Sequence, residues 1–137
     1  MPDDYQPQIR SVDDVPPDNR RGGDVRVLLS PSSVGCTAAY VGVATIGPGD
    51  WIAEHYHPFS EEFIYVASGN IVAELDGVRH ELPARHVVFI PMNVRHRLRN
   101  EGEEEAVFVF NCAPIAPRPP MGHVETEQRQ PAAAPAS

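Results

Sequence analysis

The stretch GDWIAEHYHPFSEEFIYVASG, residues 49–69, carries the features that decide the fold. His55 and His57 stand two residues apart, and in an extended strand such residues point to the same face. Glu62 lies an odd number of residues beyond His57. Its carboxylate therefore meets the imidazoles only if the chain turns at residues 58–60, whose Pro-Phe-Ser sequence favours a turn. Two imidazoles and a carboxylate at one point suit a divalent metal such as zinc, manganese, iron or nickel.

A second histidine-bearing stretch, PMNVRHRLRN, occupies residues 91–100. Arginines alternate there with His96 and Leu98, so a strand that turns its arginines to water turns His96 and Leu98 inward. A buried imidazole needs a polar partner. If that partner is a backbone carbonyl, His96 is an ordinary core residue and the earlier pair belongs to a merely histidine-rich strand. Because inward histidines and a turn-linked carboxylate occur together, we predict a metal site instead. Its predicted ligands are His55, His57, Glu62 and His96.

The spacing of these residues resembles the two sequence motifs of the cupin family. The defined positions of the first motif are all filled, by Gly49, His55, His57, Glu62 and Gly69. The second motif keeps its Pro, His and Asn as Pro91, His96 and Asn100. Its two glycines are replaced by Arg85 and Asn93, and Asn tolerates the left-handed conformation that a turn glycine usually takes. The resemblance implies an all-β, single-domain fold, the jelly-roll β-sandwich or barrel of the cupins.

Composition limits the remaining function classes. A chain of 137 residues with 42% hydrophobic residues can bury one core, and no apolar run in it is long enough to span a bilayer. The net charge of −8 argues against binding to nucleic acid phosphates. The N-terminus has acidic residues and prolines where a signal peptide needs basic and apolar ones, so we predict a cytoplasmic protein. Cys36 and Cys112 are too far apart for a paired structural zinc site, and we expect reduced core thiols.

The chain divides into three parts. Residues 1–24 form an N-terminal arm rich in Asp, Pro and Gln, which we expect to order by lying on a neighbour. Residues 25–112 form the predicted cupin β-barrel domain. Residues 113–137 form a Pro/Ala-rich C-terminal extension whose end we predict to be disordered. Asp76 and Gly77 between two apolar runs predict a hairpin. Beside the metal segment, the predicted strands are residues 25–30, 37–46, 63–68, 71–75, 78–82, 86–90, 95–100 and 106–111.

Other polar residues have less decisive positions. His80 stands among charged neighbours and is predicted to lie on the surface, and Glu61 is predicted to face away from Glu62. His86 shares a strand face with Ile90, so it could point toward the site, although side-chain parity fixes the face and not the depth. His123 could reach the metal site if the C-terminal segment folds back over the mouth of the barrel. The sequence identifies no general acid or base. The candidates by position alone are Tyr40, Trp51, Tyr65 and His86, of which Trp51 and Ala53 share the inward face of His55 if their strand is regular.

Over residues 20–127 the chain is similar to small single-domain cupin cyclases of aromatic polyketide pathways, of the tetracenomycin, resistomycin and spore-pigment type. The segments that carry this resemblance are RRGGDVRVLLSPSSVG (20–35), HYHPFSEEFIYVASG (55–69), VRHRLRN (94–100) and APRPPMGHVETE (116–127). The resemblance implies metal-dependent aldol ring closure of a poly-β-keto chain, with zinc as the favoured ion. It also implies an acyl carrier protein of a type II synthase that presents the substrate, and a homodimer.

Two alternatives remain at this point. A site of three histidines and one glutamate could also bind iron, copper or nickel and activate dioxygen, which would make the protein a metal-dependent oxygenase. A cupin that only binds a sugar or another small molecule is the other alternative. Its metal ligands would often be degraded, whereas all four are present here.

Overall fold

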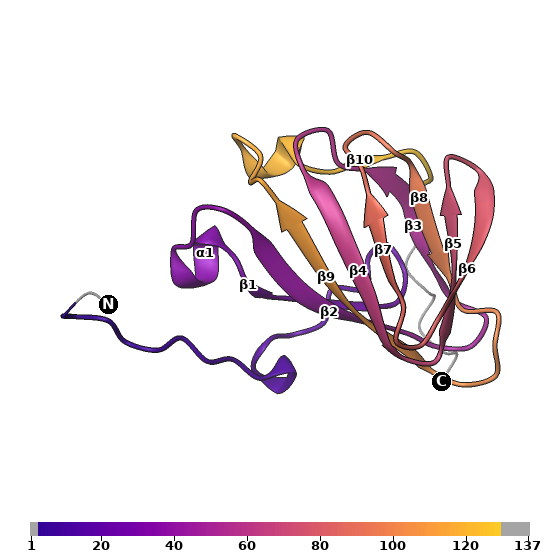
Figure 1. The fold of residues 1–137 in the computed structure, drawn as a ribbon, viewed down its shortest axis with the longest axis horizontal. Coiled ribbons are helices and arrows are strands. Elements are labelled where there is room, and N and C mark those ends of the chain that lie inside the picture. Colours follow the sequence, from indigo (N-terminus) through magenta and orange to yellow (C-terminus); the bar gives the residue numbers. More distant parts are fainter. Residues whose placement is uncertain (1–2, 130–137) are drawn as a thin grey trace, which may run out of the picture.

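The computed structural model describes residues 3–129 and contains two antiparallel five-stranded sheets that face each other (Figure 1). Sheet A has the order β1-β2-β9-β4-β7, and sheet B has the order β10-β3-β8-β5-β6. The strands of sheet A are β1 (Asp24–Leu29), β2 (Tyr40–Ile46), β9 (Ala106–Ala113), β4 (Glu61–Ser68) and β7 (Val87–Ile90). Those of sheet B are β10 (Val124–Glu125), β3 (Trp51–Tyr56), β8 (His96–Arg99), β5 (Asn70–Leu75) and β6 (Val78–Pro83). The predicted all-β, single-domain fold is confirmed.

Within residues 3–129, helix is confined to three short turns, η1 (Val12–Asp14), α1 (Pro31–Val34) and η2 (Pro119–Met121). Among residues 3–129, no helix has the length and apolarity needed to cross a bilayer. The strand alternation explains the sheets: β9 buries every second side chain from Ala106 to Cys112, and β4 does the same from Glu62 to Val66. Phe108, buried at the centre of the core, contributes about 1.5–3 kcal/mol of hydrophobic free energy.

Two turns of the barrel have left-handed residues that the sequence motif would fill with glycine. Arg85 and Asn93 both have φ of 68°. The Arg85 amide donates to Val66 O at 2.7 Å, and the Asn93 amide donates to His57 O at 3.1 Å. These bonds offset the steric cost of about 1–2 kcal/mol for a left-handed non-glycine residue. The hairpin predicted at Asp76 and Gly77 also forms, because both residues have positive φ and join β5 to β6.

A β-bulge in β3 sets which side chains face the interior. Ile52 pairs with Leu98 and His55 pairs with His96, so β3 uses three steps where β8 uses two. Ile52 and His55 consequently both point inward although their positions differ by an odd number. The prediction that Trp51 shares the inward face with His55 assumed a regular strand and is wrong, because the bulge places Trp51 on the outer face.

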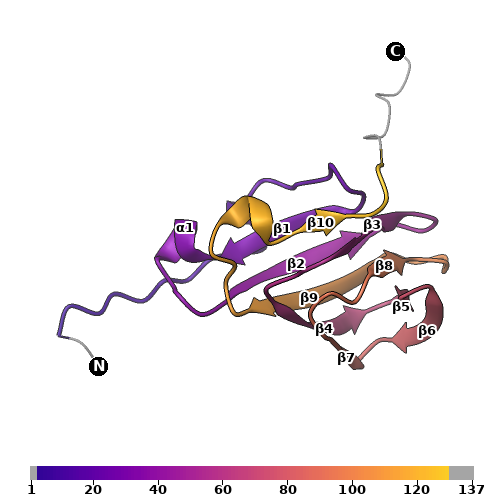
Figure 2. The same ribbon diagram turned by 90° about the horizontal axis from the view of Figure 1, so that it is seen from above.

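Both ends of the chain extend beyond the strands of the barrel core. The N-terminal arm runs outward from the body and joins it through a bridge between Asp18 and Val25 (Figure 1). After β9, residues 114–129 return across the barrel, and we call this segment the strap. Its strand β10 pairs with β3, which adds a fifth strand to sheet B (Figure 2). The disorder predicted for the end of the chain concerns residues 130–137, which lie outside the described residues.

Candidate metal centre

Four predicted residues meet between the two sheets. His55 in β3 and His96 in β8 come from sheet B, His57 directly follows the end of β3, and Glu62 in β4 comes from sheet A. Their potential ligand atoms all lie within 4.8 Å of one another, and all four side chains are buried. The turn at residues 58–60 reverses the chain between His57 and Glu62, which brings the carboxylate back to the imidazoles as the sequence required.

Backbone carbonyls fix the orientation of the three imidazoles. The Nδ1 atoms of His55, His57 and His96 lie 2.8, 2.8 and 2.9 Å from the carbonyls of Ala53, Gly122 and Val94. Nδ1 is therefore the protonated nitrogen of each neutral ring, and Nε2 keeps its lone pair.

The Nε2 atoms of His57 and His96 are buried and find no hydrogen-bond partner among residues 3–129. His96 Nε2 lies 3.0 Å from Glu62 Oε1, in a close contact that is not a well-directed hydrogen bond. Burying imidazole nitrogens with free lone pairs beside a carboxylate costs folding free energy unless a partner binds them. A divalent metal ion fits this set of donors, and zinc, iron and nickel all accept nitrogen and carboxylate ligands.

Three of the four residues, Glu62, His55 and His57, are already in the protonation state that metal binding needs. Burial would raise the pKa of Glu62, but the neighbouring imidazoles, His96 foremost, outweigh burial and lower the pKa to about 2. Burial lowers the pKa of His55 and His57, so both rings are neutral at neutral pH. For His96, burial also favours the neutral ring, but the Glu62 carboxylate outweighs it and raises the pKa. An ion in place of that proton would restore neutral imidazole at His96.

A cavity of about 540 Å³ lies over this cluster. Apolar side chains form most of its wall, and the principal ones are Val25, Val27, Ile52, Leu98, Phe108 and Phe110. His55, His57 and Glu62 contribute polar atoms. A largely apolar pocket with a few polar groups at one place suits a flat, mostly apolar molecule that carries carbonyl oxygens.

Of the four residues named as catalytic candidates, only Tyr40 lines the cavity. Trp51 lies outside, as described above. Tyr65 is 43% exposed on the outer face of sheet A, and the sequence held the signal for this, because Glu62 inward implies Tyr65 outward on the same strand. His86 is exposed and precedes β7, and its Nδ1 lies 3.0 Å from Ala84 O, so it does not reach the site.

The strap delivers His123 to the cavity, as the sequence allowed. The His123 ring stacks on His55 with centroids 4.3 Å apart and planes 15° apart. Burial lowers the pKa of His123 to about 3, and its Nε2 has no hydrogen-bond partner within residues 3–129. The strap also supplies Gly122 O, which holds the ring of His57. Sequence patterns missed that contact, because a backbone carbonyl has no side-chain signature.

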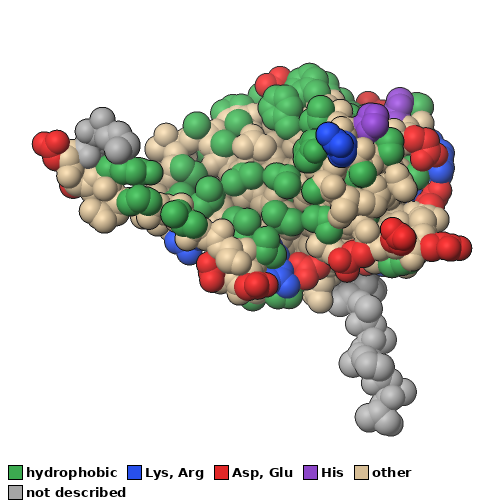
Figure 3. All heavy atoms as spheres, turned by 60° about the horizontal axis from the view of Figure 1, so that its bottom comes forward, with side chains coloured by type: hydrophobic (Ala, Val, Ile, Leu, Met, Phe, Trp, Pro, Cys, Tyr) green, Lys and Arg blue, Asp and Glu red, His purple; other side chains and the backbone are tan. Residues whose placement is uncertain are grey.

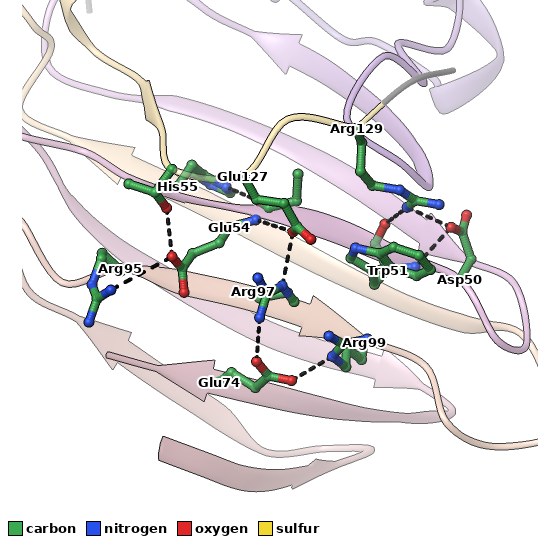
Figure 4. Close-up of polar contacts among 12 residues, drawn as sticks. Asp50, Trp51, Glu54, His55, Glu74, Arg95, Arg97, Arg99, Glu127 and Arg129 are labelled. Carbon is green, nitrogen blue, oxygen red and sulfur yellow. Dashed lines mark hydrogen bonds and ion pairs between the residues drawn. The ribbon is translucent and has the colours of Figure 1, made fainter. Parts of the chain in front are cut away.

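The outer face of sheet B carries an ion-pair network that holds the strap (Figure 4). The sequence predicted that the arginines of β8 face water. Arg97 and Arg99 do face outward, yet both pair with Glu74 of β5, and Arg97 also contacts Glu127 of the strap at 2.9 Å. Arg129 lies 3.6 Å above the ring centroid of Trp51 in a cation–π contact. These contacts leave Arg97 and Arg99 only partly exposed.

The sequence of this fold matches a known protein family. Residues 42–111 match the model described as "Cupin domain", which covers half of the chain. The chain belongs to the cupin family. The motif residues place the ligand cluster of this cupin in the segment that the family match covers, while the arm and the strap lie outside it.

Similar curated proteins come from Streptomyces. This cupin is 52% identical to Protein SchB of Streptomyces halstedii, with 91% of each chain covered. It is 47% identical to Polyketide synthase CurC of Streptomyces cyaneus, with 91% and 81% covered. It is 42% identical to Tetracenomycin polyketide synthase protein TcmJ of Streptomyces glaucescens, with 91% and 85% covered.

A solved structure supports the same fold. The polyketide cyclase RemF from Streptomyces resistomycificus aligns with a TM-score of 0.69 over 92% of this chain and 89% of its own. The two sequences are 17% identical, so this likeness concerns the fold alone.

Proposed function

We propose that this cupin is a metal-dependent cyclase that closes a ring of a poly-β-keto intermediate in aromatic polyketide biosynthesis. The observation that carries the proposal is the buried set of His55, His57, Glu62 and His96 beneath a largely apolar cavity. The names of the relatives CurC and TcmJ support the pathway, because both are described as polyketide synthase proteins.

The geometry suits an aldol closure. Such a closure removes a proton from a carbon between two carbonyls, forms a carbon–carbon bond to a third carbonyl carbon, and then loses water. A divalent ion such as zinc, held by the four ligands, would supply Lewis acidity to a substrate oxygen. The apolar wall around Phe108 and Phe110 holds the chain in one folded shape and keeps water out, which accounts for much of the selectivity in a reactive poly-ketone.

Tyr40 is one polar residue of the wall that can donate to a substrate oxygen. Its phenol lies in the cavity lining, and burial raises its pKa above the usual range. The phenol is therefore protonated at neutral pH and can act as a hydrogen-bond donor. The substrate would be a nascent polyketide, and we expect an acyl carrier protein of a type II synthase to present it.

We further propose that the protein works as a homodimer through the outer face of sheet A. Two rows of residues cross that face, with Val87, Tyr65, Val109 and Val43 in one and Phe89, Phe63, Asn111 and Val41 in the other. Phe63, Tyr65, Val87 and Phe89 are 43–63% exposed, and the ring centroids of Phe63 and Phe89 lie 5.5 Å apart with the planes tilted by 32°. Figure 3 shows apolar side chains gathered in the middle of this side of the molecule.

A second copy is the occupant that fits this face. A contiguous patch of exposed apolar side chains often marks an interface. Two chains that each carry a net charge of −8 repel one another, and an approach through the apolar middle of this face keeps most of their carboxylates apart. A two-fold contact of the same face on both copies satisfies both requirements.

The same ligand set supports a second candidate function. Three histidines and a glutamate also bind iron, copper or nickel, which can pass electrons to dioxygen, so the oxygenase alternative has the same structural basis. Zinc has a filled d shell and cannot change oxidation state, and this difference separates the two reactions.

The test adds purified protein to a minimal polyketide synthase under strict anaerobiosis. Zinc-loaded protein should direct the nascent chain toward one ring pattern, and the metal-free protein should do so poorly. His55→Ala should behave like the metal-free protein, whereas His80→Ala, a change at an exposed histidine, should match the wild type. Activity that requires oxygen and returns only with iron, copper or nickel would instead identify an oxygenase.

A further inference from the structure

Cys112 lies directly behind the carboxylate of Glu62. The two residues are cross-strand partners on β9 and β4, and the Cys112 side chain is fully buried. Its Sγ lies 3.0 Å from Glu62 Oε2. A carboxylate offers only acceptors, so this contact requires the proton on sulfur, and the thiol donates it to Oε2.

The two oxygens of Glu62 therefore have different surroundings. Oε2 accepts the thiol and lies 3.8 Å from His57 Nε2. Oε1 accepts no hydrogen bond in acceptable geometry and lies 3.0 Å from His96 Nε2, which itself finds no hydrogen-bond partner among the described residues. Oε1 is thus the oxygen that shares an open position with a free imidazole nitrogen.

The row of cross-strand partners that contains Glu62 and Cys112 continues to the wall of the cavity. Tyr40 of β2 is the cross-strand partner of Cys112 on its other side, and its ring packs edge-on against Phe110. Tyr40, Cys112 and Glu62 are therefore successive neighbours across three strands of sheet A. Tyr40 and Glu62 line the cavity, whereas Cys112 lies between them and outside the lining.

We propose that Cys112 is a positioning residue for the metal ligand Glu62: its thiol proton holds Oε2, so that Glu62 binds the ion through Oε1 alone. The proposal rests on the metal site proposed above. Without the donor, the carboxylate is free to turn, and both oxygens can reach the ion. Hydrogen-bond partners of metal ligands commonly change metal affinity 10–100-fold, and the ligand role of Glu62 makes this contact one of them.

The experiment compares metal binding by four full-length proteins: wild type, Cys112→Ala, Cys112→Ser and Cys36→Ala. Metal-free protein is titrated with Zn²⁺ in competition with a chromophoric chelator, and visible spectra are recorded after loading with Co²⁺. Cys112→Ala should bind Zn²⁺ about 10-fold more weakly or worse. Its Co²⁺ absorption should also weaken, because a second carboxylate oxygen raises the coordination number. Cys112→Ser keeps a donor and should recover most of the affinity and the wild-type spectrum.

Cys36→Ala is the matched control, because the Cys36 thiol donates to Ala39 O, outside the cluster, and should change neither readout. Equal affinity and equal spectra in wild type and Cys112→Ala would overturn the proposal and leave Cys112 as core packing. Equal losses in Cys112→Ala and Cys112→Ser would overturn it as well. So would a near-ultraviolet thiolate-to-cobalt band in the wild type, since the thiol would then bind the ion itself. If the wild type binds neither ion, the metal site itself is wrong, a result distinct from a failure of Cys112 alone.

Discussion

The outer faces of the two sheets differ in side-chain chemistry and in what covers them. On sheet B the face carries charges, and the strap lies over part of it: Glu74 pairs with Arg97 and Arg99, and Arg129 packs on Trp51 (Figure 4). On sheet A the middle of the corresponding face consists mainly of valines and aromatic rings. Four of its large apolar side chains are exposed within the described chain: Phe63, Tyr65, Val87 and Phe89.

The difference shows how each sheet solves the same problem. A sheet in a two-layer fold buries one face in the core, and its other face must be exposed to water or covered. The charged face of sheet B attracts a segment of its own chain through directed contacts. On sheet A the directed contacts lie at the β1 edge, where Arg26 donates to Val12 O and Val15 O of the N-terminal arm. The apolar middle of that face has exposed side chains on β4 and β7, and hydrophobic burial against a second copy is the solution that we propose for it. In this proposal the outer face of sheet B is partly covered by its own chain, and the outer face of sheet A is covered by a second copy.

The largest expected effect is on dimer formation and comes from placing a charge in the apolar face of sheet A. Tyr65 lies between Val87 and Val109 in the middle of that face. In Tyr65→Glu, two introduced carboxylates would meet across the two-fold axis, and like charges opposed in an interface cost several kcal/mol. Light scattering should give a mass of about twice 15.0 kDa for the wild type. Measured over a range of protein concentrations, it should give a dimer dissociation constant for the variant that is raised more than about 100-fold.

Val78→Glu is the control for this change. Val78 is an exposed apolar residue of β6 in the other sheet, so its replacement should leave the dimer intact. Circular dichroism should show that Tyr65→Glu keeps the fold. A wild-type mass of one chain at all concentrations, or an unchanged dimer in Tyr65→Glu, would mean that another molecule or none covers the face.

An intermediate effect concerns the strap, which carries His123 into the site. The pKa of His123 is lowered to about 3 in the folded protein, against about 6.5 for an unfolded histidine. Between these values the unfolded chain binds a proton that the folded chain does not, so the stability of metal-free protein should fall as pH drops below about 6.5. At pH 5 the loss due to His123 is about 2 kcal/mol. The lowered pKa values of His55 and His57 act in the same direction, and the raised pKa of His96 opposes them.

His123→Gln tests this assignment. Thermal unfolding in the presence of a chelator should show a large fall in melting temperature from pH 7.5 to 5 for the wild type and a smaller fall for the variant. His80→Gln, at an exposed histidine, should keep the wild-type pH dependence. An identical fall in His123→Gln and wild type would show that His123 is already accessible to protons in the folded state.

The smallest effect is expected on the charged face. Glu74→Gln removes the carboxylate that two partly buried arginines share, and we expect a loss of about 1 kcal/mol in the free energy of unfolding. High salt should shrink the difference, because ions screen charges near the surface. Glu81→Gln removes a carboxylate that pairs with Arg79 in an exposed position and should cost less. Equal losses in the two variants would show that the network adds nothing beyond ordinary surface pairs.

Much of the site could be predicted from side-chain alternation. His55 and His57 lie two apart, and His96 stands between outward arginines, so the faces of these residues followed from strand geometry. Trp51 could not be placed in this way, because the bulge in β3 depends on how β3 pairs with β8. His86 shows the other limit, since it precedes β7 and is exposed, and alternation along the expected strand did not place it.

The sequence by itself determined the cupin motifs, the strand pattern, the hairpin at Asp76 and the four residues of the proposed metal centre, because these depend on local spacing. Tertiary structure decided the rest. It brought His123 and Gly122 to the site on the strap, put Cys112 behind Glu62, and left Tyr65 on an exposed apolar face. Contacts of this kind join residues far apart in the chain, and their geometry depends on packing and strand register, which no local pattern encodes.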